Sequence, residues 1–405
     1  MSDSLDDLAA FLMHRTADPD TPEEERLSVF VLVEAYQEGD DPDAVVAALR
    51  TAALRYAGHR DHRPEWRPKL GANVAIADDS AARPAELPRL GPLRYATTDM
   101  LRIAYYETGP DDGAPVLLLH GYPYDIHSFI EVIPQLAAAG HRVIVPYLRG
   151  HGPTQFLSAD TPRSGQQGAV GADVIALLDA LDIGRAVLAG FDWGGRAACV
   201  AAALWPDRCA GLVSVNSYLI QDINAAMTTP IRPDLEAGLW YFYYFLTQRG
   251  KAGLAANRSE IAKVIWKRNS PNWRFDEATF QRAAGAMDNP DYVEVVLHSY
   301  RHRLGQAPGF PAYDKIETKL AAQPPITVPT VTLDGMADGN FPAGDGAASA
   351  QHFTGGRTHH QVPNAGHNLP QEAPDAFAAA VLEVQNLDIK DNAGSVGMRN
   401  SSAAR

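Results

Sequence analysis

Asp192 is the residue whose setting most clearly predicts chemistry. It lies in the string GFDWGG at 190–195, with an apolar run at 186–189 before it and a run of small residues at 196–203 after it. This is the pattern of a strand, a tight turn and a helix, in which glycines let the backbone turn sharply and lift the central side chain clear of the sheet. A carboxylate there suits displacement at saturated carbon, because the alkyl ester it forms can still be hydrolysed, whereas a serine ether could not.

Hydrolysis of such an ester needs an oxyanion hole, and the string HGYP at 120–123 offers one. It follows an apolar run at 116–119. The backbone N–H of Tyr122 can therefore pair with that of Trp193, the residue after the nucleophile. The same string could also be a simple turn at a strand end.

Attack of water on the ester needs a base, and His367 is the candidate. It lies on the loop expected between a last short strand, ending at 361–362, and a helix at about 372–386. The strand, turn and helix around Asp192 form what is called a nucleophile elbow. In folds with such an elbow the histidine comes after the nucleophile and the acid in the sequence, as His367 does. His359 and His360 lie before that strand or at its start, so we expect them at the surface.

A carboxylate must orient this base, and Asp338 is the candidate, in the loop after a strand expected at 328–333. Asp334 lies nearer to the strand and is the alternative. The other usual location has no acid, because the chain reads Asn-Ser-Tyr at 216–218 after the apolar run at 212–215.

The leaving group decides what else the site requires. Opening an epoxide releases an alkoxide whose oxygen needs an acid, and tyrosine, with a pKa of about 10, suits this task. A halide needs only N–H donors in an apolar pocket. The segment at 217–320 offers several tyrosines, although any one could equally be a packing residue. They are Tyr241, Tyr243, Tyr244, Tyr292 and Tyr300.

Alternating strands and helices are expected to position these residues. Apolar runs predict strands at 116–119, 143–145, 212–215 and 328–333, and helices are expected around 128–139 and 168–181. Such alternation indicates an α/β fold with a mostly parallel, doubly wound sheet covered on both faces. The aromatic-rich, helical residues 217–320 interrupt it, and we expect them to form a lid over the carboxyl ends of the strands, where ligands bind.

The expected domain organisation has a small helical extension before the α/β core. Its parts are a helical N-terminal extension (1–66), a linker (67–92), the first part of the core (93–216), the helical lid (217–320), the second part of the core (321–388) and a flexible tail (389–405).

Bulk properties narrow the class of protein. The chain of 405 residues has a net charge of −14, which argues against nucleic acid or an anionic membrane as a partner. Cys199 and Cys209 are expected to be core thiols, and the sequence shows neither a basic leader nor an apolar run of membrane-spanning length. We expect a cytoplasmic enzyme with a small-molecule substrate and no metal or organic cofactor. The N-terminal helices could support a homo-oligomer or bind a partner.

With these residues assembled, residues 95–388 resemble the α/β-hydrolase fold and, within it, the epoxide hydrolase branch. The string at 120–123 is similar to the HGxP oxyanion motif of that branch. Asp192, Asp338 and His367 are similar to its catalytic triad. The resemblance implies hydrolysis of an epoxide through a covalent intermediate on the aspartate.

The resemblance also selects two of the lid tyrosines. Tyr241 lies four residues before a phenylalanine, and Tyr300 is followed by an arginine, as in the two lid motifs of the branch. In that family the two tyrosines activate the epoxide oxygen. The residues expected to border the substrate pocket are His120, Pro123, Trp240, Tyr244 and Arg196.

Several positions keep a dehalogenase open as the alternative. Arg196 is similar to an arginine near the elbow with which haloacetate dehalogenases hold a substrate carboxylate, but those carry a further arginine where this chain has Trp193. Haloalkane dehalogenases share the tryptophan and use it as a halide donor, but many carry asparagine where this chain has Tyr122. Tyr147 stands where the epoxide hydrolase branch usually has an acid, which leaves the pocket shape open.

The N-terminal segment implies no activity. Residues 54–66 resemble the end of a small uncharacterised actinobacterial helical domain. His59 and His62 could suggest a metal site, but no cysteine or clustered acid completes the set. We expect both histidines at the surface.

Three hypotheses remain. The leading one is opening of an epoxide to a vicinal diol. The second is a haloalkane or haloacetate dehalogenase with the same Asp-His-Asp triad. The third, of another class, is a non-catalytic protein that binds a small ligand, and the intact triad argues against it.

Overall fold

The computed structural model describes residues 3–16, 29–30, 33, 36, 49, 90–385 and 387. The chain divides into two compact units, Met1–Leu87 and Pro88–Arg405. Most of the expected linker and the expected C-terminal tail lie outside the described residues. So do His59, His62 and most of the helices expected within residues 1–66.

The described part of the first unit centres on helix α1 (Asp3–Thr16). Leu8 and Leu12 recur at helical spacing and are fully buried, in one apolar cluster with Val29 and Val33. The helix predicted from this spacing is therefore present, and one face of it packs a small core.

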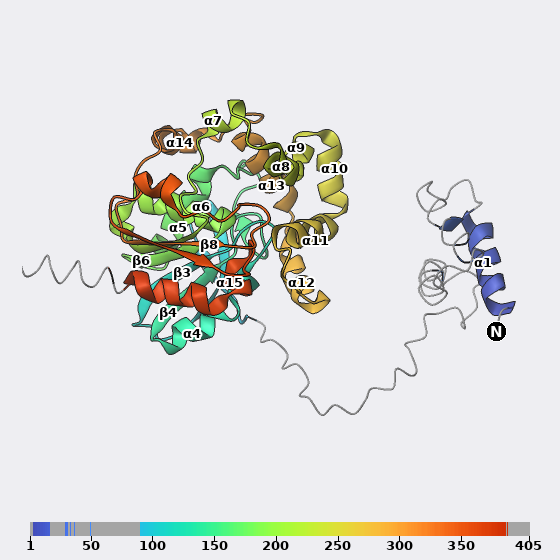
Figure 1. Ribbon diagram of the computed structural model, residues 1–405, viewed down its shortest axis with the longest axis horizontal. Coiled ribbons are helices and arrows are strands. Elements are labelled where there is room, and N and C mark those ends of the chain that lie inside the picture. The colour runs from blue at the N-terminus through green and yellow to red at the C-terminus, as the bar shows by residue number, and fades with distance from the viewer. Residues whose placement is uncertain are drawn as a thin grey trace, which may run out of the picture. The chain divides into compact units, whose positions relative to one another are not determined.

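A mixed sheet forms the centre of the second unit (Figure 1). Its order is β1-β2-β4-β3-β6-β7-β8-β9, with β5 paired to β2. The pairs from β4 through β9 are parallel, whereas β1, β2 and β5 pair antiparallel. The strands are β1 (Arg94–Thr97), β2 (Leu101–Thr108), β3 (Ala114–Leu119), β4 (His141–Pro146), β5 (Gln155–Phe156), β6 (Ala186–Gly190), β7 (Cys209–Val215), β8 (Thr330–Gly335) and β9 (Arg357–Val362).

The predicted α/β sheet is confirmed, and each strand predicted from an apolar run is present. The antiparallel edge was not among the predicted strands. Burial in β1 and β2 is interrupted by exposed residues, so neither strand reads as a continuous apolar run. The sequence signal that marks the central parallel strands is therefore weak at this edge.

Helices cover both faces of the sheet (Figure 1). Helices α5 (Gln167–Ala180) and α6 (Asp192–Leu204) pack together on one face. On the other face α4 (Val132–Ala138) lies beside the helix at 374–385, where Gln135 Nε2 donates to Asp375 Oδ1 at 2.9 Å.

Two predicted helices differ from the structure at their ends. The helix expected around 128–139 begins later, because Ile126–Phe129 forms a 3-10 turn in which the Asp125 side chain accepts from the His127 N–H. The last helix is divided into α15 (Leu369–Glu372) and residues 374–385.

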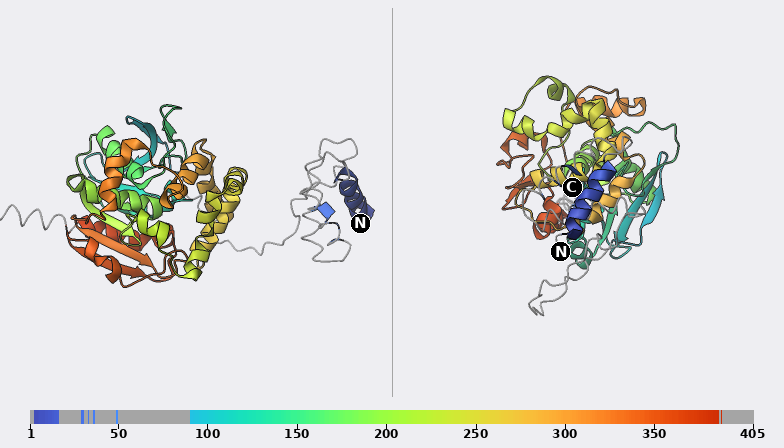
Figure 2. Two further views of the ribbon diagram at one scale, coloured as in Figure 1. Left: turned by 90° about the horizontal axis from the view of Figure 1, so that it is seen from above. Right: turned by 90° about the vertical axis from the view of Figure 1, so that its right-hand side faces the viewer.

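The residues between β7 and β8 form the predicted helical insertion. Its helices are α7 (Ile223–Thr228), α8 (Pro233–Gly238), α9 (Trp240–Leu246), α10 (Gln248–Ala256), α11 (Arg258–Asn269), α12 (Glu277–Ala284), α13 (Tyr292–Arg303) and α14 (Asp314–Ala321). The yellow helices of its middle part, α9 to α12, gather along one edge of the core in the left view of Figure 2. No helix among the described residues is both long and apolar enough to span a bilayer.

Candidate active site

The backbone at Asp192 forms the sharp turn that the sequence predicted. Asp192 joins β6 to α6 with a φ of 50°, a left-handed conformation that costs energy for a residue other than glycine. A Cβ at Gly194 would lie 2.0 Å from the Leu119 carbonyl oxygen, so only glycine lets α6 approach β3 this closely. The turn therefore raises the Asp192 side chain above the carboxyl ends of the central strands.

The two oxygens of Asp192 have different partners. Oδ1 accepts a hydrogen bond of 2.7 Å from the Tyr122 N–H. Oδ2 lies 3.4 Å from Nε2 of His367. Burial alone would raise the pKa of this carboxyl, but His367 and the Tyr122 and Trp193 amides outweigh burial and lower it. Asp192 is therefore an ionised carboxylate beside the two amides predicted as the oxyanion hole.

His367 and Asp338 form the rest of the triad. The Nδ1–H of His367 donates to Asp338 Oδ2 at 2.8 Å. Burial opposes the charged ring, but the charges and hydrogen bonds of Asp338 and Asp192 prevail and raise the pKa of His367 to about 10. In the free protein the histidine is therefore an imidazolium between two carboxylates.

Asp338 is held by four donors. Its Oδ1 accepts from the N–H groups of Asn340 and Phe341 at 2.7 and 2.9 Å. Its Oδ2 accepts from the Asn216 side chain at 3.2 Å as well as from His367. Asn216 directly follows β7, which is the other usual location of the triad acid. Here it donates a hydrogen bond to Asp338, the acid that follows β8.

The alternative acid, Asp334, does not contact the base. Its Oδ2 accepts from the Gly344 N–H at 2.9 Å and lies 4.0 Å from Nε2 of His359. Asp334 lies within β8 and Asp338 lies in the loop after it, and the structure brings Asp338 to His367.

The loop that carries His367 depends on two residues that the sequence analysis did not single out. Ser270 Oγ accepts from the His367 N–H at 3.1 Å and donates to Glu372 at 2.6 Å. Glu372 also accepts from the N–H groups of Gly366 and Asn368 at 2.7 and 3.0 Å. These bonds fix the loop from the α11 side and from α15.

Tyr241 and Tyr300 lie together above the elbow. Their rings, from α9 and α13, have centroids 5.4 Å apart, and the ring of Tyr300 lies 5.8 Å from that of Trp193. Both tyrosines are buried, and burial is the main cause that raises the pKa of each. The two phenols are thus protonated at neutral pH and can donate.

The other lid tyrosines lie elsewhere. Tyr243 is exposed and donates to Glu236. Tyr292 stacks on Tyr122 with centroids 6.2 Å apart. Tyr244 packs against Trp240 at 5.7 Å, and both are only partly buried.

Two of the predicted pocket residues position the oxyanion loop. His120 uses both ring nitrogens on the backbone: Nδ1 bonds the Gly121 carbonyl at 2.9 Å, and Nε2 accepts from the Leu148 N–H at 3.1 Å. Burial lowers its pKa to about 3, so the ring is neutral. The Pro123 carbonyl accepts from the indole N–H of Trp266 on α11 at 2.9 Å.

Arg196 lies on α6 one turn after Asp192 and is buried. Its Nη1 lies 3.4 Å from the side-chain oxygen of Gln221, a residue that the sequence analysis did not single out. Cys199 and Cys209 are both buried free thiols. In the part of the chain that the structure describes, no group of three or more His, Cys, Asp or Glu side chains could hold a metal ion.

Similarity to known proteins agrees with this geometry. The family model of the α/β hydrolase fold matches residues 114–374. Epoxide hydrolase A of Mycobacterium tuberculosis is 27% identical over 318 residues, covering 72% of this chain and 96% of that protein. A haloalkane dehalogenase of Psychrobacter cryohalolentis is 39% identical over only 29% of this chain and 39% of that protein.

A solved structure covers the same region. A candidate epoxide hydrolase from Klebsiella pneumoniae is 48% identical, with a TM-score of 0.72, over 74% of this chain and 99% of that chain. The fold and the family match define a hydrolase of the α/β-hydrolase fold family, and this chain belongs to that family. Within it, the chain belongs to the epoxide hydrolase-like branch.

Proposed function

We propose that the protein opens an epoxide to a vicinal diol through an ester on Asp192. Oδ1 of Asp192 accepts from the Tyr122 N–H, so Oδ2 is the oxygen that attacks a ring carbon. The carbon–oxygen bond of the ring breaks, and the departing oxygen takes a proton from Tyr241 or Tyr300. Oδ1 becomes the ester carbonyl oxygen and is already in the oxyanion hole.

The second step hydrolyses the ester. Loss of the Asp192 charge lowers the pKa of His367, because that charge is one of the causes that raise it. The imidazolium proton is released, and the neutral ring takes a proton from water as the oxygen of that water attacks Cγ of the ester. The amides of Tyr122 and Trp193 hold the resulting oxyanion. Collapse releases the diol oxygen, which takes the proton from His367 and leaves Asp192 as a carboxylic acid. That acid passes its proton to His367, which restores the carboxylate and the imidazolium, and the phenolate is reprotonated from solvent.

The buried tyrosine pair beside the elbow is the observation that carries this proposal. An alkoxide is a poor leaving group without a proton donor, and two adjacent buried phenols that stay protonated at neutral pH support such a role. A halide would leave without them. The triad alone would not distinguish between the two leaving groups.

One observation favours the dehalogenase as second candidate. The indole N–H of Trp193 is buried without a well-aligned hydrogen-bond partner. Such a donor in an apolar pocket could receive a halide. The two reactions share every step at Asp192 and His367, so the test must identify what is transferred.

The test is intact-protein mass spectrometry of a His367→Ala variant incubated with a panel of epoxides, haloalkanes and haloacids. Without its base the enzyme should stop at the ester, and an added mass equal to the whole epoxide is expected. Asp192→Asn is the matched control and should gain nothing. An added alkyl or carboxymethyl group with release of halide would establish the dehalogenase instead. No adduct on the folded variant would favour the ligand-binding protein.

A further inference from the structure

Two buried arginines meet beside the active site. Arg196 on α6 and Arg303 at the end of α13 are 9% and 8% exposed. Nη1 of Arg196 and Nε of Arg303 lie 3.4 and 2.6 Å from the same atom, the side-chain oxygen of Gln221. The two nitrogens are therefore no more than about 6 Å apart, a span that one carboxylate could bridge.

Gln221 is fixed in this orientation. Its Nε2 donates to the Arg303 carbonyl at 3.3 Å, and its own N–H donates to the Gln167 side chain at 2.9 Å. The amide oxygen therefore faces the guanidinium groups. It is a neutral acceptor, so it does not itself neutralise either positive charge.

No Asp or Glu of the described residues forms an ion pair with either arginine, and Nε of Arg196 is buried without a hydrogen-bond partner. Burial and the repulsion of Arg303 lower the pKa of Arg196 to about 9. Buried charges in proteins are normally paired, because an unpaired one loses its hydration without compensation. Two adjacent unpaired guanidinium groups therefore indicate a site for an anion.

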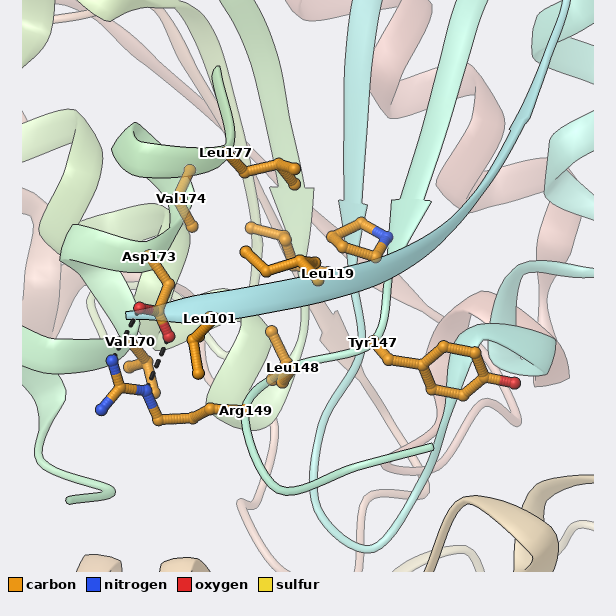
Figure 3. A pocket seen from close by; sticks show the side chains of 11 residues that line it. Leu101, Leu119, Tyr147, Leu148, Arg149, Val170, Asp173, Val174 and Leu177 are labelled. Carbon is orange, nitrogen blue, oxygen red and sulfur yellow. Dashed lines mark hydrogen bonds and ion pairs between the residues drawn. The ribbon is translucent and has the colours of Figure 1, made fainter. Parts of the chain in front are cut away.

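A third buried arginine shows the usual arrangement. Arg149 donates from Nε and Nη2 to the two carboxylate oxygens of Asp173, each at 2.6 Å (Figure 3). Burial opposes its charge, but the attraction of Asp173 outweighs burial and raises its pKa. Arg149 thus has the carboxylate that Arg196 and Arg303 lack.

The arginine pair adjoins the reacting groups. The guanidinium carbon of Arg303 lies 5.4 Å from the ring centroid of Tyr300 and 4.8 Å from that of Phe242. Arg196 follows Asp192 by one helical turn. An anion held there would lie beside Tyr300.

We propose that Arg196 and Arg303 bind a carboxylate of the substrate, which is then an epoxide that carries an acid group. The inference rests on the proposed function, because it places the acid group on the molecule that Asp192 attacks. Guanidinium groups suit planar, bidentate recognition of a carboxylate. The chain as a whole has a net charge of −14, so it does not attract acids in general. The positive charge of the arginine pair would therefore favour an acid at this site alone.

The first test compares 3-phenylglycidate with 3-phenylglycidamide, which differ only in the acid group. The wild-type kcat/KM should favour the acid by about tenfold or more, and Arg303→Gln should remove about tenfold or more of this preference. Arg303→Lys should restore part of it. The control is Arg232→Gln, because Arg232 is exposed on the lid and paired with Asp234. It should leave the ratio as in the wild type.

The second test needs neither turnover nor a variant. Calorimetry should show wild-type protein binding 3-phenylpropionate about tenfold or more tighter than 3-phenylpropionamide. Equal affinity for these two ligands would overturn the carboxylate site. In the first test, an acid-to-amide ratio of kcat/KM that Arg303→Gln leaves unchanged would overturn it as well. If both epoxides are hydrolysed with equal kcat/KM, the proposed epoxide hydrolase activity is supported and the carboxylate site is rejected. If neither epoxide reacts with Asp192, the proposed function loses support, and calorimetry still decides the anion site.

Discussion

The triad differs from the side of the active site that faces the lid in how its polar groups are paired. This second side, called the lid side, comprises Tyr300 with Trp193 and Arg196 from α6. Both oxygens of Asp192, both ring nitrogens of His367 and both oxygens of Asp338 have partners within the chain. Facing them, the described residues include buried donors without well-aligned partners. These are the Trp193 indole N–H and Nε of Arg196.

The difference separates polar groups whose hydrogen bonds are made within the chain from polar groups that a ligand could bond. Buried polar groups are usually satisfied, so the satisfied triad is ready before substrate arrives. The unsatisfied donors are the places where a substrate would supply acceptors. Substitutions in the triad should therefore affect every substrate, whereas substitutions on the lid side should discriminate between substrates.

The largest effect is expected from Asp192→Asn on the triad side. An amide cannot displace the ring oxygen, so kcat for any epoxide should fall by about 10⁴-fold or more. Steady-state diol formation measures this loss, with circular dichroism to verify the fold. Activity within tenfold of the wild type would mean that the nucleophile lies elsewhere.

Tyr300→Phe on the lid side should be next. Removing one proton donor should lower kcat for an epoxide by about 10²- to 10³-fold and leave halide release from a haloalkane nearly unchanged. Tyr243→Phe is the matched control, because Tyr243 is exposed and bonded to Glu236. An equal loss on both substrates would show that Tyr300 supports the site rather than the leaving oxygen.

The protonation of His367 tests the coupling within the triad. In Asp192→Asn the pKa of His367 should fall by about one unit or more, because a charge that raises it is gone. NMR titration of the ring protons measures this change. The wild-type pKa of about 10 lies above the ordinary value of 6.5, so protonation stabilises the fold below pH 6.5 and this contribution is lost as pH rises towards 10. An unchanged titration would assign the shift to Asp338 alone.

The smallest effect should come from Trp193→Phe on the lid side. The backbone amide that serves the oxyanion remains, so epoxide turnover should fall by less than about tenfold. Release of halide from a haloalkane should fall much further if the indole is the halide donor. Parallel assays with one epoxide and one bromoalkane compare the two losses.

The sequence was most informative where the site depends on local pattern. The elbow at Asp192 needs its glycines next to it, and Asp338 and His367 lie on loops whose position follows from strand order. Tyr241 and Tyr300 were separated from the other lid tyrosines only by resemblance to a family. Packing of the lid decides which of them reach the elbow.

The rest depends on contacts between distant segments. Gln221 and Arg303 come together with Arg196 only in the folded chain, as do Ser270 and Glu372 beneath His367. One signal could have indicated Arg303, since it lies three residues after Tyr300 and so on the same side of α13. No comparable local signal marks Gln221.

The bond between the Trp266 indole and the Pro123 carbonyl links the lid to the oxyanion loop. If α11 swung outward, it would break this bond or displace the peptide next to Tyr122, and the site would lose its alignment with the bound ester. A substrate is therefore expected to enter past rotating side chains and the other lid helices, with α11 as a fixed wall. Substrate can then enter and react while the oxyanion loop at Tyr122 keeps its conformation through each turnover.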